Sequence, residues 1–304
     1  MPSPDEVSIA SGPLSARFRP EWGGRMTHLT HAEWGDILVP THEDRFEPDS
    51  WPRAGGYPLV PYHNRIYNSR FAHAGAWYSL CPHPALAPDA IHGPAHRRPW
   101  SVAAQANDRV LLQLDYDADD EWPFSFRAEQ QFLLEPNQLV VELAITNLSG
   151  RTAPVGIGWH PYIAAPLHSP AETDGKFEYQ LDDLNVPTSH LPQPRSEVII
   201  PATSGYTLHF ADWTRANVRL DKASLLLKAD PVFGHLAVHR MENYLCIEPV
   251  SMAAGVLALS ERNRTDRGLR ILPHGGCLSG RITLSIKPNG DETPPTLGAA
   301  MWRM

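Results

Sequence analysis

The chain lacks long apolar runs, paired cysteines and an excess of positive charge. No apolar run approaches the roughly 20 residues that a membrane-spanning helix needs, and the N-terminal MPSPDEVSIA has neither the basic flank nor the apolar segment of a secretory signal. The three cysteines, Cys81, Cys246 and Cys277, are odd in number and widely spread, which is typical of a reducing compartment and not of a disulfide framework or a zinc cluster. The formal net charge of −8 argues against nucleic acid and anionic membranes as partners. We therefore expect a soluble, cytoplasmic protein.

The sequence also leaves little room for long helices, because 30 of its 304 residues are proline. Its apolar residues instead recur with a period of two, the pattern of half-buried strands in antiparallel sheets. In Gln138–Asn147 the apolar side chains fall on the odd positions, and Phe124–Leu134 and Arg281–Ile286 alternate equally well. We expect an all-β fold, with residues 1–290 as a single-domain β-sandwich of mostly antiparallel strands and residues 291–304 as a C-terminal tail. Further strands are predicted at Tyr206–Phe210, Ser224–Ala229, Leu236–Arg240 and Tyr244–Glu248.

Two long segments do not follow this alternation. Residues 48–99 are rich in turns and proline, but their aromatic side chains need burial, so we expect a folded loop region and not a linker. Residues 164–205 are polar and interrupted by proline, and we expect them to pass over the edge of a sheet. No internal repeat or shift in composition marks a domain boundary.

The stretch VGIGWHPYI at residues 155–163 combines glycine, a histidine and aromatic rings. Glycine inside an extended run indicates a bulge, or the close approach of a ligand or another backbone. Pro161 lacks a backbone donor, so we expect the strand to end at His160 or just after it. A histidine at that place can reach into a cleft, and its proton can move near neutral pH. The alternative is a buried histidine beside a turn.

A second stretch, YLCIEPV at residues 244–250, places a carboxylate in a similar position. Because side chains alternate along a strand, Leu245 and Ile247 share one face, and Tyr244, Cys246 and Glu248 share the other. Glu248 would lie at a strand end before a proline, where a carboxylate is a candidate general base. The alternative is an ordinary solvated glutamate.

Two further stretches carry polar side chains next to glycine and proline. GGYPLVPYHNRI places Arg65 after a double glycine, and arginine offers a fixed fork of donors for adjacent hydroxyls or a carboxylate. IHGPAHRRPW places His92 before a glycine turn. The alternative for Arg65 is a surface salt bridge.

Other patterns do not predict a metal or cofactor. On a strand, His235 and His239 would lie roughly 13 Å apart and could not share a metal ion. The acidic residues 117–121 lack the glycine of a calcium loop, and no GxSxG elbow of a serine hydrolase occurs. The Arg262–Arg270 group could bind an anion, although such a cluster is more often a solvated loop. We expect neither a metal nor a cofactor.

Taken together and in order, these stretches resemble the aldose 1-epimerase (galactose mutarotase) family. The resemblance runs from GPLSARFRPEWGGRM through PLVPYHNRI, the HG turn, PVGIGWHPY and CIEPVS, and so covers most of the chain. It implies a galactose mutarotase-like β-supersandwich, a small-molecule sugar substrate and a mechanism without a metal. In that mechanism the α and β anomers of an aldose interconvert by opening and closing of the sugar ring.

The resemblance also implies roles for individual residues. His160 falls on the catalytic acid, Glu248 on the base, and His92 on a histidine that helps at the ring oxygen. We expect the carboxylate and the protonated imidazole to lie on opposite sides of the sugar, each contributing roughly 10²–10⁴ in rate.

Substrate-binding residues follow from the same resemblance. Arg65 and Asp212 would bind sugar hydroxyls, with Asn64 beside Arg65, and the ring of Tyr62 or Trp213 would stack on the apolar face of the sugar. Tyr62 stands where many members have tryptophan.

Two alternatives remain open. One is a non-catalytic sugar-binding or regulatory protein on the same scaffold, because a fold does not fix a function. The other is a hexose-6-phosphate mutarotase, which Arg97, Arg98 and the Arg262–Arg270 group would favour if they reached the site. We expect free aldoses to be preferred, because the NRI signature at residues 64–66 is associated with the free-sugar branch.

Overall fold

The computed structural model describes residues 6–50, 52–188, 191–195, 198–260, 264 and 267–289. In these residues the secondary structure consists of β-strands and four short 3₁₀ turns, and the strands pair in antiparallel fashion. No helix in these ranges is long and apolar enough to cross a membrane. The 3₁₀ turns are Pro48–Ser50, Tyr67–Ser69, Ala95–Arg97 and Val256–Ala258.

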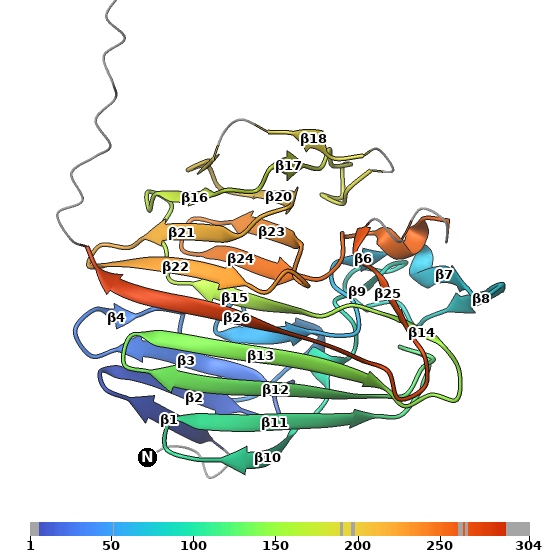
Figure 1. Cartoon of the computed structure of the whole chain (residues 1–304), viewed down its shortest axis with the longest axis horizontal. Coiled ribbons are helices and arrows are strands. Elements are labelled where there is room, and N and C mark those ends of the chain that lie inside the picture. The colour runs from blue at the N-terminus through green and yellow to red at the C-terminus, as the bar shows by residue number, and fades with distance from the viewer. Residues whose placement is uncertain are drawn as a thin grey trace, which may run out of the picture.

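Two large sheets dominate the molecule (Figure 1). The first has eleven strands, ordered β1-β2-β3-β5-β15-β24-β23-β20-β17-β18, with β4 paired to β3. Its strands are β1 Val7–Ser11, β2 Leu14–Arg19, β3 Arg25–His31, β4 Gly35–Asp36, β5 Gly56–Leu59, β15 Gly158–Ile163, β24 Leu245–Val250, β23 His235–Arg240, β20 Tyr206–Ala211, β17 Phe177–Glu178 and β18 Gln193–Pro194.

The second sheet has nine strands, ordered β10-β11-β12-β13-β26-β22-β21-β16-β19. Its strands are β10 Ser101–Gln105, β11 Arg109–Tyr116, β12 Phe126–Glu135, β13 Gln138–Asn147, β26 Cys277–Pro288, β22 Ala223–Ala229, β21 Arg215–Arg219, β16 Ala171–Thr173 and β19 Ile199–Ile200. Three short pairs complete the fold: β6 Arg65–Ile66 with β9 Ala90–Ile91, β7 Arg70–His73 with β8 Ala76–Ser79, and β14 Ala153–Val155 with β25 Arg270–Leu272.

The main hydrophobic core lies between the two large sheets. Phe18 on β2 meets Phe132 on β12 with ring centroids 4.7 Å apart, and Leu139 on β13 and Ile282 on β26 are buried in the same cluster. Alternation explains this arrangement, because every second side chain of each strand points between the sheets. The predicted all-β sandwich is confirmed.

Most predicted strands are confirmed with small shifts at their ends. The prediction Gln138–Asn147 coincides with β13, and Phe124–Leu134 corresponds to β12. Residues 164–205 were expected to pass over the edge of one sheet. The structure shows instead that short strands in this segment pair with both large sheets. The predicted tail, residues 291–304, lies outside the described residues.

Candidate functional site

The eleven-stranded sheet buries both of its faces near its centre. Leu245 and Ile247 of β24 point into the main core, whereas Cys246 belongs to a separate small cluster with Tyr57 and Tyr162. The predicted division of β24 into an apolar and a chemical face is therefore confirmed.

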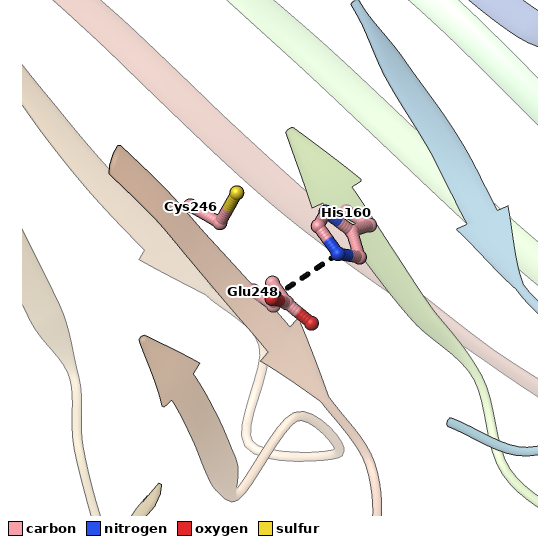
Figure 2. Close-up of side chains that lie close together, drawn as sticks. All are labelled: His160, Cys246 and Glu248. Atoms are coloured by element: carbon pink, nitrogen blue, oxygen red, sulfur yellow. Dashed lines mark ion pairs between the residues drawn. The ribbon is translucent and has the colours of Figure 1, made fainter. Parts of the chain in front are cut away.

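His160 and Glu248 are direct neighbours on this second face. In the pairing of β15 with β24, Gly158 lies opposite Val250 and Tyr162 opposite Cys246, which places His160 opposite Glu248. Figure 2 shows the two side chains pointing toward each other, with the imidazole Nε2 3.4 Å from the carboxyl Oε1. Cross-strand neighbours on one face are held at contact distance by the backbone, so the sheet itself positions this pair.

The two prolines do not end their strands, which corrects the expectation from the sequence. β15 continues to Ile163 and β24 to Val250, so His160 and Glu248 lie inside strands. Pro161 removes only one backbone donor, and the N–H of the next residue, Tyr162, donates to the carbonyl of Gly55 at 2.8 Å. Pairing on both sides therefore carries the strand through the proline.

Glycine allows the close approach of these strands. A Cβ at Gly158 would lie 2.7 Å from Cγ1 of Val250 and 3.0 Å from the carbonyl oxygen of Pro249. Any larger residue would push β24 away from β15 and separate His160 from Glu248. The sequence prediction that a glycine here indicates a close backbone approach is confirmed.

Burial sets the protonation of the pair. His160 and Glu248 are 6% and 4% exposed. Desolvation raises the pKa of Glu248 to about 8, while burial and then the neighbouring His92 lower the pKa of His160 well below its ordinary value. At neutral pH the pair therefore favours a protonated carboxyl beside a neutral imidazole, with one exchangeable proton between them.

Two tyrosine rings pack against the imidazole of His160. The ring of Tyr57 on β5 stacks on His160 at 4.7 Å, and that of Tyr162 stacks at 4.8 Å. Tyr57 lies opposite His160 in the pairing of β5 with β15, and Tyr162 follows His160 by two residues on the same face. Neither tyrosine was predicted from the sequence as a site residue, although the spacing of two could have identified Tyr162. Arg53 was not predicted either, and it shares a side-chain hydrogen bond with Tyr162.

His92 lies at the edge of this group. Its ring centroid is 5.5 Å from that of His160, nearly perpendicular to it. The backbone N–H of Asn64 donates to His92 Nδ1 at 3.1 Å, so a neutral His92 carries its proton on Nε2. Burial, and then the charge on His63, lower the pKa of His92 well below its ordinary value. His92 is therefore a neutral hydrogen-bond donor.

The HG turn fixes the direction of His92. His92 and Gly93 both have positive φ, +59° and +68°. A Cβ at Gly93 would lie 2.2 Å from the carbonyl oxygen of Val60, so only glycine fits after the histidine.

Arg65 and Asn64 lie beside His92 on the neighbouring turn. The side chain of Asn64 accepts the backbone N–H of Arg65 at 2.7 Å, and Arg65 on β6 lies opposite Ile91 on β9. The guanidinium of Arg65 pairs with Asp89 at 3.2 Å and is 19% exposed. Arg65 thus forms a half-buried ion pair near the site. This agrees in part with the alternative that Arg65 makes a salt bridge.

The structure places three of the proposed sugar ligands in the main core or at the exposed end of a strand. Tyr62 is buried in the main core with its ring 5.4 Å from that of Trp122, so it cannot stack on a substrate at the second face. Trp213 is also a core residue, and its indole N–H donates to the carbonyls of Phe233 and His235. An aromatic residue next to a motif can point to either face of its strand. The rings of Tyr62 and Trp213 both point into the main core.

Asp212 lies at the exposed end of β20. Its carboxylate pairs with Lys176 at 2.9 Å, and its side chain is 53% exposed. β20 is two strands from β24 in the sheet order, roughly 10 Å at the usual strand spacing. The structure does not bring Asp212 together with His160 and Glu248.

The expectation that no cluster has workable metal-ligand spacing was wrong. One ligand atom each from His160, Cys246 and Glu248 lies within 4.8 Å of the others (Figure 2). Spacing within a single segment cannot reveal this group, because it forms across two strands that are about 85 residues apart in the chain.

The two arginines after the HG turn are bound to acids. Arg97 pairs with Asp49 at 3.3 Å and with Glu121 at 2.6 Å. Arg98 pairs with Asp119 at 2.9 Å and with Glu121 at 3.0 Å. Their charges are therefore already compensated.

Two described members of the Arg262–Arg270 group, Arg264 and Arg267, make contacts within the protein. Arg264 donates to three backbone carbonyls, those of Leu257, Leu259 and Ala72. Arg267 lies over the ring of Tyr179 at 5.7 Å. Arg264 therefore holds chain segments together, and Arg262 lies outside the described residues.

Comparisons with known proteins agree with this fold. The sequence model of the family described as aldose 1-epimerase matches residues 6–227. The uncharacterized protein YphB of Escherichia coli K12 is 32% identical over 109 residues. This alignment spans 36% of this chain and only 37% of YphB.

Two solved structures superpose over nearly the whole chain. A protein of Escherichia coli K12, provisionally described as an aldose 1-epimerase, gives a TM-score of 0.82 at 19% identity and covers 93% of this chain and 99% of its own. A galactose mutarotase-like protein of Clostridium acetobutylicum gives a TM-score of 0.80 at 18% identity, with 93% and 95% covered. At these identities the structures show the fold, and the predicted galactose mutarotase-like sandwich is confirmed.

Proposed function

The chain belongs to the aldose 1-epimerase family, and on that premise we propose that it interconverts the α and β anomers of a free aldose at His160 and Glu248. The observation that carries the proposal is the contact of 3.4 Å between these two buried, titratable side chains. A proton donor and a proton acceptor held together out of water are what ring opening requires.

The side-by-side arrangement suits the chemistry better than the expected opposite-sides arrangement. In a cyclic aldose the anomeric hydroxyl and the ring oxygen are bonded to the same carbon, so the groups that serve them must also be neighbours. With 3.4 Å between Nε2 and Oε1, no sugar fits between His160 and Glu248. The substrate would instead lie over both side chains.

One proton on the pair is sufficient for the reaction. One partner removes the proton of the anomeric hydroxyl while the other delivers its proton to the ring oxygen. The bond between the anomeric carbon and the ring oxygen breaks, and the anomeric C–O bond becomes a carbonyl. Rotation about the C1–C2 bond presents the other face of the carbonyl, and the same transfers in reverse close the ring to the other anomer.

Either partner can begin the cycle, because the reaction runs in both directions. A protonated Glu248 with a neutral His160 has the same proton count as a carboxylate with an imidazolium. We assign Glu248 as the base toward the anomeric hydroxyl and His160 as the acid, as the resemblance implies, and the sugar hydroxyls would favour the charged form by replacing lost solvation.

The neighbouring residues support this assignment. Tyr57 and Tyr162 fix the plane of the His160 ring. A neutral His92 with its proton on Nε2 would donate to the ring oxygen or a neighbouring hydroxyl. Asn64 and Arg65 remain proposed hydroxyl ligands beside His92, with Arg65 oriented by Asp89.

Anomerisation assays over a panel of sugars test the proposal. Freshly dissolved α-glucose, α-galactose and their 6-phosphates would be followed by polarimetry or by NMR of the anomeric proton, with and without the protein. We expect acceleration for at least one free aldose, strongly reduced in His160→Asn. If sugars bind, as seen by NMR line broadening, and no anomerisation is accelerated, the protein is a non-catalytic sugar binder.

A further inference from the structure

We propose that His160, Cys246 and Glu248 form a binding site for a thiophilic divalent cation such as Zn²⁺, and that the bound ion blocks the sugar site. The blocking part rests on the proposed function, whereas the binding of the ion does not.

The spacing of the donor atoms is close to that of the ligands around a tetrahedral ion. Metal–ligand bonds of about 2.0–2.3 Å place neighbouring ligands of tetrahedral zinc roughly 3.3–3.8 Å apart. His160 Nε2 and Glu248 Oε1 are already 3.4 Å apart. Since all three ligand atoms lie within 4.8 Å of one another, the sulfur needs to approach by about 1 Å at most.

The sheet presents these ligands without rearrangement of the backbone. Cys246 and Glu248 are two residues apart on β24 and so project from the same face, and His160 faces them from β15 (Figure 2). All three are buried, and Tyr57 and Tyr162 hold the imidazole by stacking. A preformed set of three ligands is the arrangement in which zinc keeps a fourth position for water or another oxygen ligand.

The chemical types of the donors select the class of ion. A thiolate, an imidazole and a carboxylate suit Zn²⁺ and other thiophilic ions, whereas Mg²⁺ and Ca²⁺ require mostly oxygen ligands. A thiolate and a carboxylate together balance the two charges of the ion.

Both anionic ligands are needed, because cations lie nearby. The charges of Arg25 and Arg53 reach His160, and that of Arg53 reaches Cys246. These guanidiniums oppose a metal ion, so we expect that removing the thiolate alone abolishes most of the affinity.

An ion at this position would prevent catalysis directly. It would occupy His160 Nε2 and a Glu248 oxygen, the two atoms between which proton transfer to the sugar is proposed. The proposed mechanism leaves Cys246 without a role, and the metal site supplies one. Zinc should therefore compete with the sugar.

The first experiment measures metal binding alone. Protein freed of metal with a chelator would be titrated with Zn²⁺ by calorimetry and with Co²⁺ by absorption, where a thiolate-to-metal charge-transfer band reports the sulfur ligand. We expect one ion per chain, with Mg²⁺ unable to displace it. Cys246→Ala should lower the affinity at least tenfold and remove the charge-transfer band.

Matched controls use the two exposed cysteines. Cys81→Ser and Cys277→Ser should bind Zn²⁺ with the affinity of the wild type. Unchanged affinity in Cys246→Ala, or a loss that follows Cys81 or Cys277, would overturn the site.

The second experiment separates this proposal from the proposed function. Zn²⁺ should raise the apparent KM for the sugar in the wild type, and Cys246→Ala should need at least tenfold more Zn²⁺ for the same effect, measured against its own metal-free rate. If the protein binds Zn²⁺ at Cys246 and anomerises no sugar, the metal site is supported and the proposed function is wrong. If the protein anomerises sugar and is equally sensitive to zinc with and without Cys246, the proposed function is supported and the metal site is wrong.

Discussion

The two faces of strand β24 are equally buried and chemically opposite. Leu245 and Ile247 on one face and Cys246 on the other have no measurable exposure, and Glu248 is only 4% exposed. The first face packs apolar groups between the sheets, where burial stabilises the fold. The second desolvates titratable groups, and this raises the pKa of Glu248 to about 8. Burial therefore stabilises the fold on one face of the strand and shifts the protonation of side chains on the other.

Glu248→Gln is the strongest test of this division. The amide keeps the size of the carboxyl and most of its hydrogen bonding but can no longer exchange the proton. We expect the anomerisation rate to fall by about 10²–10⁴, with little change in the free energy of unfolding, as measured by NMR anomerisation and urea titration. A variant with the rate of the wild type would make Glu248 a structural residue only.

Ile247→Ala tests the apolar face of β24, at the residue that precedes Glu248 in the chain. Removing this buried side chain should lower the free energy of unfolding by about 2–5 kcal/mol, because it leaves a cavity between the sheets. The rate per folded molecule should stay close to that of the wild type at a temperature where the variant is folded. A large loss of rate with unchanged stability would contradict the division of β24.

The sequence separates these two faces well, because a period of two needs no knowledge of the rest of the fold. It identifies β13 to the residue and assigns Ile247 and Glu248 to opposite sides. It cannot tell whether a strand continues through a proline, since that depends on which neighbours pair with it. Pro161 and Pro249 therefore lie inside strands that were expected to end there.

The contents of the site depend on the pairing of distant segments. Tyr57 reaches His160 only because β5 pairs with β15, and Cys246 reaches it only because β24 pairs on the other side. Tyr62 follows Tyr57 closely in sequence and yet lies in the main core. Local pattern predicts the side of a strand, whereas the order of the strands decides which residues meet.

Buried histidines on and beside the second face should make the fold sensitive to acid. Burial lowers the pKa of His63 to about 4 and those of His209 and His235 to about 3. In the unfolded chain these histidines bind protons below about pH 6.5, whereas in the folded chain they stay neutral at that pH. Their contribution to the free energy of unfolding is therefore fully present above about pH 6.5. It is lost as the pH falls from about 6.5 toward 3–4, by up to about 3 kcal/mol for His63 alone.

Urea titrations at pH 7 and pH 4.5 measure this effect. His63→Gln should reduce the difference in the free energy of unfolding between the two pH values, because the substituted side chain no longer takes up a proton on unfolding. His168→Gln is the matched control, since His168 has an exposed side chain and should leave the difference unchanged. Equal pH dependence in all three proteins would show that the acid sensitivity arises elsewhere.

The smallest expected effect concerns the arginines after the HG turn and the choice between free and phosphorylated sugars. Arg97 and Arg98 would favour a 6-phosphate only if their charges were available, because a charge-assisted hydrogen bond to phosphate is roughly twice as strong as a neutral one. Both are instead paired with acids, and Arg97 is one of two arginines that share Glu121. We therefore expect free aldoses to be preferred, and Arg97→Ala and Arg98→Ala to leave the ratio of kcat/KM for glucose and glucose 6-phosphate unchanged. Loss of the more exposed pair between Arg98 and Asp119 should lower stability by at most about 1 kcal/mol. A preference for the phosphate of about tenfold, or 1.4 kcal/mol, that disappears in either variant would show that a sugar phosphate draws these arginines away from their acids.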